Sequence, residues 1–284
     1  MKKILIVFLL AIIPLGLFAQ DSTNILVGKK GIAILPQAGD FAIGIDAVPY
    51  INFLGNALSS GGNNLNLNNS NTLYGKYYLD QNTAIRAELY SYHLNETFRN
   101  YVTDDAAVYN DPNSMAQVVD ILKMQTHSYG IGVGIQKYRG YGRLRGTYGG
   151  QISYLRSKSQ SDYTWGNAMN ALNPSPTSTF WSTTGDFRYL NLNNEASNTV
   201  AIGALAGIEY FFLPKICIGG EVGLSYTYGW SKQSNYTYEE VQDLSGTPTR
   251  VEIERMLSPG DSYSAIQTWL YGAPAGRIYV LFHF

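Results

Sequence analysis

Three histidines and one cysteine are the residues of this chain with the greatest capacity for chemistry. His93 follows Ser91 by two residues and precedes Glu96 by three, so the residue types of a serine–histidine–carboxylate hydrolase occur close together. Such a set works only when its members hydrogen-bond to one another, and closeness in sequence does not provide that geometry. No motif flanks these residues. We therefore predict no catalytic residue and no enzymatic activity, with a lipid-modifying or proteolytic enzyme as an alternative.

Metal, cofactor and phosphate sites leave spacing patterns that this sequence lacks. No His or Cys pair has the spacing of a zinc site, and a single Cys217 cannot form an intramolecular disulfide. The glycines of segment 130–134 alternate along an extended run, so they indicate room in a crowded interior rather than a phosphate loop. We expect no cofactor. We expect no metal either, because no ordered calcium-ligand spacing connects four nearby acids, Asp104, Asp105, Asp111 and Asp120.

Charged residues of the extended runs form a balanced set on one face. If the runs are strands of a membrane-spanning barrel, Arg or Lys on the lipid-facing surface would cost about 2–4 kcal/mol at mid-bilayer, so the charged face must point into the barrel. A charge without a partner away from water is expensive, so equal numbers of acids and bases predict a cross-linked polar plug. The alternative is a narrow ion-conducting path, that is, a porin or small-solute channel. The inward charges are Asp46, Glu88, Glu209 and Glu221, with Lys76, Arg86, Arg143 and Arg145.

The elements that must position these charges are runs with a period of two. Each run has an apolar face and a face of polar or small residues, which is typical of a strand. An even number of strands is expected of a single-chain bacterial barrel. We therefore predict an all-β fold, an eight-stranded antiparallel up-and-down transmembrane β-barrel. The eight runs lie at 41–53, 73–79, 83–93, 126–138, 142–156, 199–211, 215–230 and 276–284.

The connections between the runs alternate strictly between short and long. Short turns lie at 80–82, 139–141 and 212–214, and long connections at 54–72, 94–125, 157–198 and 231–275. A barrel inserted from the periplasm has short periplasmic turns and long extracellular loops. Within the long connections, segment 115–124 is compatible with a short helix or a strand. Segments 237–241 and 250–254 predict a hairpin, and aromatic residues either pack on one another or form a binding surface.

The composition favours a membrane-spanning sheet. Charged residues make up 14% of the chain, against about 25% in an average soluble domain, and Tyr and Gly are abundant. Beyond residue 19 no run of 18 apolar residues occurs, so membrane-spanning helices are excluded. A formal net charge of −1 argues against a nucleic-acid partner.

The first residues have the pattern of a targeting segment. Lys2 and Lys3 precede an apolar run at 4–18, which is too short to span a bilayer as a helix, and Ala19 offers a cleavage position. We predict a signal peptide at 1–19, a short periplasmic segment at 20–40 and the barrel at 41–284.

Several segments resemble Bacteroidota-type outer-membrane β-barrel proteins, which include small barrels of the OmpA and OmpX type. They are 39–51, 74–79, 83–87, 207–211 and the closing 279–284. The resemblance implies an integral outer-membrane protein in contact with outer-membrane lipid, with both termini in the periplasm. It also implies that Tyr279, Phe282 and Phe284 belong to a C-terminal signal for the barrel-insertion machinery. Loops would contact an extracellular or membrane-protein partner, in a structural or surface-interaction role.

Overall fold

The computed structural model describes residues 26–28, 31–47, 50–52, 72–140, 142–179, 181, 183–184, 187–244, 247–267 and 277–284. The predicted signal peptide and almost all of the first predicted long connection lie outside these residues. The fold is all-β with antiparallel pairing, as the sequence predicts. No helix in the described ranges is both long enough and apolar enough to cross a membrane.

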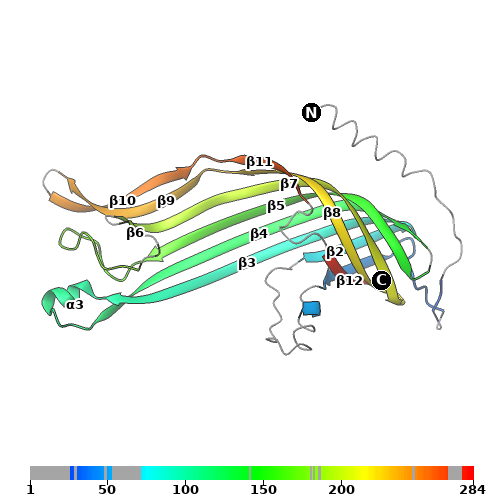
Figure 1. Ribbon diagram of the computed structural model, residues 1–284, viewed down its shortest axis with the longest axis horizontal. Helices are drawn as coiled ribbons and strands as arrows, with labels where there is room; N and C mark the ends of the chain where they lie inside the picture. Colours follow the sequence, from blue (N-terminus) through cyan, green and yellow to red (C-terminus); the bar gives the residue numbers. More distant parts are fainter. Residues whose placement is uncertain are drawn as a thin grey trace.

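The described residues form twelve strands, a short helical stretch at 50–52 and a short helix near one end of the molecule (Figure 1). The helix is α3 (Asp105–Asn110), which Asp104 caps by accepting a hydrogen bond from the amide of Ala107. The strands are β1 (Phe41–Asp46), β2 (Thr72–Asp80), β3 (Thr83–Thr103), β4 (Gln117–Arg139), β5 (Leu144–Thr164), β6 (Thr183–Thr184), β7 (Phe187–Leu213), β8 (Ile216–Ser231), β9 (Ser234–Leu244), β10 (Thr247–Ser258), β11 (Ser262–Gln267) and β12 (Arg277–His283).

Each predicted run contains a strand, but the lengths and the number of strands differ from the prediction. β1 ends at Asp46 rather than at 53, and residues 50–52 are helical. β3, β4, β5 and β7 are longer than predicted; in β5 the added residues 157–164 are mostly polar on both faces, so they lack the alternation that the prediction needs. β6, β9, β10 and β11 were not among the eight runs.

Eight of the strands are joined in a closed ring of antiparallel pairings. The order is β1–β2–β3–β4–β5–β7–β8–β12, and β12 pairs with β1. Ala42 lies opposite His283 and Ile45 opposite Val280, so the predicted pairing of the last run with the first is confirmed. In Figure 1 the ring lies at the right-hand end, where the C-terminus is marked. The short turns after β2, β4 and β7 are all at one end of it, because their strands are hairpin neighbours.

A sheet extends beyond the ring on one side. β3, β4, β5 and the first part of β7 continue away from it, and the hairpin β9–β10 adds to β7 (Figure 1). Val241 pairs with Arg250, which confirms the predicted hairpin. Segment 115–124 belongs mainly to β4, so the strand alternative for it is correct. β11 pairs with residues 225–230 of β8, and β12 pairs with residues 216–221 of the same strand.

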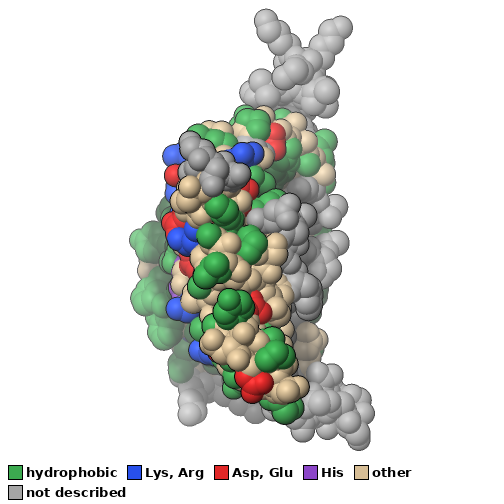
Figure 2. All heavy atoms as spheres, turned by 90° about the vertical axis from the view of Figure 1, so that its left-hand side faces the viewer, with side chains coloured by type: hydrophobic (Ala, Val, Ile, Leu, Met, Phe, Trp, Pro, Cys, Tyr) green, Lys and Arg blue, Asp and Glu red, His purple; other side chains and the backbone are tan. Residues whose placement is uncertain are grey.

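The polarity of the ring is reversed relative to a water-soluble protein. Large apolar side chains are exposed on the outside, among them Ile85, Val133 and Ile152, with exposed fractions of 44%, 46% and 51%. Charged side chains are buried inside, among them Arg86 and Glu209, with exposed fractions of 2% and 0%. Figure 2 looks along the molecule from the extension and shows charged side chains near the viewer, with a hydrophobic flank behind them.

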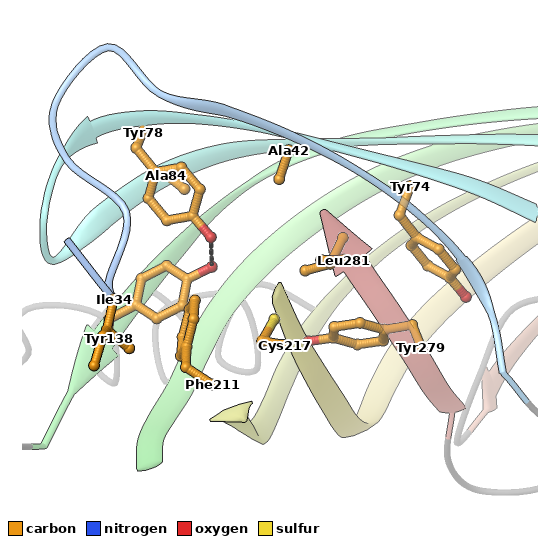
Figure 3. Close-up of a cluster of buried hydrophobic side chains, with 10 residues drawn as sticks. All are labelled: Ile34, Ala42, Tyr74, Tyr78, Ala84, Tyr138, Phe211, Cys217, Tyr279 and Leu281. Atoms are coloured by element: carbon orange, nitrogen blue, oxygen red, sulfur yellow. Dashed lines mark hydrogen bonds between the residues drawn. The ribbon is translucent and has the colours of Figure 1, made fainter. Parts of the chain in front are cut away.

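The N-terminal segment packs across the turn end of the ring. Ile34 is buried there against Tyr78, Tyr138 and Phe211 (Figure 3). The amide of Gly39 donates to the carbonyl of Tyr78 at 2.8 Å, which ties the segment to β2. Apolar packing and backbone hydrogen bonds together close this end of the ring.

Candidate functional site

The interior of the ring holds a buried polar network that begins next to the apolar cluster of Figure 3. Lys76 of β2 forms an ion pair with Glu209 of β7 and donates a hydrogen bond to the Tyr138 hydroxyl at 3.0 Å. Tyr138 and Tyr78 share a hydrogen bond of 3.1 Å between their hydroxyls. The Tyr279 hydroxyl donates to Glu209 at 2.8 Å. This layer therefore cross-links β2, β4, β7 and β12 through the interior.

A second layer is centred on Arg86 of β3. Its two terminal nitrogens donate to the two carboxylate oxygens of Glu221 in β8, each at 2.8 Å, and it also pairs with Glu88. Glu88 receives a hydrogen bond of 3.0 Å from Gln151 of β5 and lies 2.8 Å from Arg277 of β12. Bidentate pairing of this kind is directional as well as strong, so it fixes the distance between opposite walls of the ring.

Glycines on the inner face provide the room that these large side chains need. A Cβ atom on Gly219 would lie 2.3 Å from the ring of Tyr279, and one on Gly132 would lie 2.7 Å from the amide nitrogen of Gln151. Either contact is far shorter than van der Waals packing allows. Gly132 and Gly134 of β4 thus face a crowded interior, as the sequence indicates.

The eight charges predicted to point inward fall into two groups. Five of them form the network just described: Lys76, Arg86, Glu88, Glu209 and Glu221. Asp46 is half-buried, and its charge acts on Tyr74. Arg145 is buried at the turn end, where it donates to the Asn82 side chain at 2.6 Å. Arg143 lies at the same end and donates to the backbone carbonyls of Phe212 and Phe211, near the end of β7, at 2.9 and 3.0 Å, outside the ion-pair network.

Arg277 is the member of the network that was absent from the predicted set. It lies on the same face of β12 as Tyr279, Leu281 and His283, all of which are buried. The alternation of β12 was the signal that identified this position as inward. Of the residues predicted for C-terminal recognition, Tyr279 is buried inside, whereas Phe282 and Phe284 are exposed outside. Their recognition by an insertion machinery stays a prediction.

The residues with a capacity for catalysis are not brought together. Ser91 and His93 alternate with Glu96 along β3, so the carboxylate belongs to the opposite face. The imidazole of His93 instead contacts His127, with ring centroids 4.1 Å apart, and Asn95 at 2.8 Å. Cys217 is buried in the interior, where its thiol donates to Glu209 at 3.7 Å.

A second polar cluster, which sequence reasoning missed, fastens the long β5–β6 connection to the extension. Asp120 of β4 is fully buried and accepts hydrogen bonds from the amides of Gly166 and Thr179 at 2.8 and 2.7 Å. Arg188 pairs with Glu239 at 2.5 Å. The aromatic residues around it pack on one another, and they are Tyr163, Trp165, Phe187, Tyr189, Tyr236 and Tyr238.

The other acids of this region act as local acceptors. Burial alone would raise the pKa of Asp105, but hydrogen bonds from Thr177 and Asn173 outweigh it and hold that pKa below its ordinary value. Asp111 accepts from the amide of Asn113 at 3.0 Å. Each of these acids therefore has a structural partner within its own loop or the neighbouring one.

Replacing Asp120 with alanine is expected to detach segment 166–179 from the extension. Two backbone amides and the Thr179 hydroxyl would lose their acceptor, and leaving buried donors without a partner costs about 1–3 kcal/mol each. Hydrogen exchange of the Gly166 and Thr179 amides should accelerate, while exchange in the ring strands stays unchanged. Asp111→Ala removes an acid of the same region that is exposed, and it should leave both amides as slow as in the unchanged protein. Unaltered exchange in D120A would contradict the assigned role.

Comparison with known proteins assigns no family to this fold. No protein-family model matches the chain, and no curated protein matches it. The arrangement described here offers two features for functional inference: an interior crossed by paired charges and an exterior covered by apolar side chains.

Proposed function

We propose that this chain is an integral outer-membrane β-barrel protein, in which the eight ring strands cross the bilayer around a plugged polar interior. The observation that carries the proposal is the reversed polarity of the ring, with Arg86 and Glu209 buried inside and Val133 and Ile152 exposed outside. In water, such an exterior would be unfavourable by roughly 25 cal/mol for each Å² of apolar surface. In a bilayer the same surface contacts lipid, and the charges stay out of the hydrocarbon.

The height of the apolar exterior supports this proposal. On β5 the outward apolar residues run from Leu144 to Tyr154, which are ten residue steps apart. At a rise of about 3.3 Å per residue this is about 33 Å along the strand. With the strand tilt of about 35–45° found in membrane barrels, the height is about 25 Å, the apolar height of such barrels.

The proposed orientation follows from the two ends of the ring. Short turns and the packed N-terminal segment occupy one end, and the long extension with α3 and β9–β10 occupies the other. Bacterial barrels have short periplasmic turns and long extracellular loops. We therefore place the turn end and the C-terminus in the periplasm, and the extension outside the cell.

A non-enzymatic role as a membrane-anchored support fits the interior best. The two charge layers tie opposite walls together, and their members Arg86, Glu88 and Glu209 have exposed fractions of at most 2%. Eight strands enclose a space that side chains can fill, so the charges act as cross-links rather than as a selectivity filter. In this role the barrel holds the extension rigidly above the membrane as a surface for contacts.

Purified full-length protein, refolded in detergent, is expected to migrate faster in SDS gels before heating than after it, because a closed ring resists SDS. Reconstituted in planar bilayers, the same preparation should produce no discrete conductance steps. Recovery of the chain from the soluble fraction, with no heat-dependent migration, would contradict the membrane proposal. Stable conductance steps in an otherwise heat-modifiable protein would contradict only the plugged interior and would favour a narrow porin.

A further inference from the structure

Four basic side chains gather on the outward face of the ring strands, and we refer to them as the basic cluster. They are His93 on β3, His127 on β4, and Arg156 and Lys158 on β5. In the strand registers His127 lies opposite both His93 and Lys158. Ser128, which alternates with them on β4, is buried on the inner face, so the cluster faces outward.

The basic cluster borders a hollow in the outer surface. The hollow has a volume of about 320 Å³ and is lined by His127, Arg156, Lys158 and the exposed Tyr129. His93 contacts His127 ring to ring and by a hydrogen bond between their Nδ1 atoms, which holds His127 at the edge of the hollow. A volume of this size is in the range of small-ligand sites. Figure 2 shows histidine next to Lys or Arg side chains on this flank of the molecule.

The two strongest cations of the cluster lack acidic partners. Among the residues that the structure describes, Arg156 and Lys158 form no ion pair, whereas Arg86, Arg188 and Arg277 each pair with a glutamate. Arg156 and Lys158 are two residues apart on the same face of β5, so their positive charges repel each other. An anion in the hollow would remove that repulsion, and it would accept charge-assisted hydrogen bonds from both side chains.

The cluster lies where a membrane changes from hydrocarbon to headgroups. Arg156 follows Tyr154, the last outward residue of the apolar stretch of β5, by two positions, and Tyr129 lies opposite Arg156 on β4. Tyrosines of this kind mark the interface level of a membrane protein. Arg156 is thus at the level of the tyrosines, and Lys158 is two residues farther along β5, away from the hydrocarbon.

We propose that the basic cluster binds the phosphate group of a phosphorylated lipid in the outer leaflet. The inference rests on the proposed membrane insertion and adds a ligand class to it. Arg156 offers a planar fork of donors that matches phosphate oxygens, and Lys158 and the histidines add further N–H donors. Tyr129 and Tyr154 would contact the part of the lipid that is next to its headgroup.

The test uses the full chain in nanodiscs of phosphatidylcholine that contain a minor fraction of phosphorylated lipid A. Native mass spectrometry after transfer to mild detergent then measures how much lipid A stays bound. The unchanged protein should retain phosphorylated lipid A and not its dephosphorylated form. The double substitution Arg156→Ala/Lys158→Ala should reduce retention by about tenfold or more, because losing one charge-assisted hydrogen bond already has an effect of this size.

The matched control is Arg99→Ala/Lys123→Ala. Both residues are exposed on the same outward face, and their removal lowers the charge by the same amount. Arg99 is six residues beyond His93 and Lys123 is four residues from His127, so they lie about 20 Å and about 13 Å along their strands from the cluster, away from the apolar stretch. This variant should retain lipid A like the unchanged protein.

Three outcomes would overturn the proposed lipid site while leaving the barrel intact. They are equal retention in R156A/K158A and in the unchanged protein, equal loss in the control variant, and equal binding of dephosphorylated lipid A. Full displacement of the lipid by inorganic phosphate would also overturn the lipid proposal, because it would show that the cluster binds soluble phosphate. Failure of the unchanged chain to enter nanodiscs contradicts the membrane proposal itself, and the lipid site with it.

Discussion

Replacing Lys76 with methionine is expected to lower the free energy of unfolding by about 3–5 kcal/mol. Lys76 is the ion-pair partner of Glu209, and both side chains are almost completely buried in the ring. Without it, a carboxylate with an exposed fraction of 0% keeps, among the residues that the structure describes, the hydroxyl of Tyr279 and the thiol of Cys217 as donors. The loss can be measured by urea unfolding of the protein in lipid vesicles.

A double-mutant cycle separates the charge effect from lost packing. Adding E209Q to K76M neutralises the buried acid, so the double variant should recover much of the lost free energy. Lys215→Met provides a matched control, because the ion pair of Lys215 with Asp40 is partly open to solvent. An ion pair that keeps part of its contact with water contributes less than a fully buried pair, so the loss in K215M should be smaller than the loss in K76M. If K76M and K215M were equally stable, the interior network would not carry the stability assigned to it.

Replacing Val133 with arginine is expected to destabilise the vesicle-inserted protein, lowering its free energy of unfolding by about 2–4 kcal/mol. Val133 is 46% exposed at the middle of the outward apolar stretch of β4, between Ile131 and Ile135. In a bilayer this position faces hydrocarbon, where a guanidinium loses its hydration. The measurement is the same urea titration, with the vesicle-bound fraction followed by tryptophan fluorescence.

The sign of this effect distinguishes a membrane protein from a soluble one. In water, an arginine at an exposed strand position would be neutral within about 0.5 kcal/mol and would improve solubility. Met256→Arg is the control, since Met256 is 68% exposed on β10 of the extension and lies outside the proposed membrane region. Equal behaviour of V133R and M256R would remove the main support for membrane insertion.

The sequence by itself determined which face of each ring strand points inward. Alternation is a local property, so Ile278 and Phe282 could be separated from Tyr279 and Leu281 without knowing any partner strand. It also determined which strands are hairpin neighbours, because two strands joined by a tight turn pair with each other. The pairing of β1 with β12 could also be predicted, because each end strand of an open sheet has unpaired backbone N–H and C=O groups, and closing the ring pairs them.

Only the tertiary structure decided which charges meet. Arg86 and Glu221 are 135 residues apart in the chain and come together because the ring places β3 opposite β8. Alternation assigned Arg143 to the inner face, but its position at the turn end sends its side chain to backbone carbonyls instead. Apart from the β9–β10 hairpin and the strand alternative for segment 115–124, the extension was not predictable, because its strands are held by pairing and by Asp120 across distant segments rather than by an apolar pattern of their own. Local periodicity encodes the direction of a side chain, whereas its partner depends on how distant strands are placed in space.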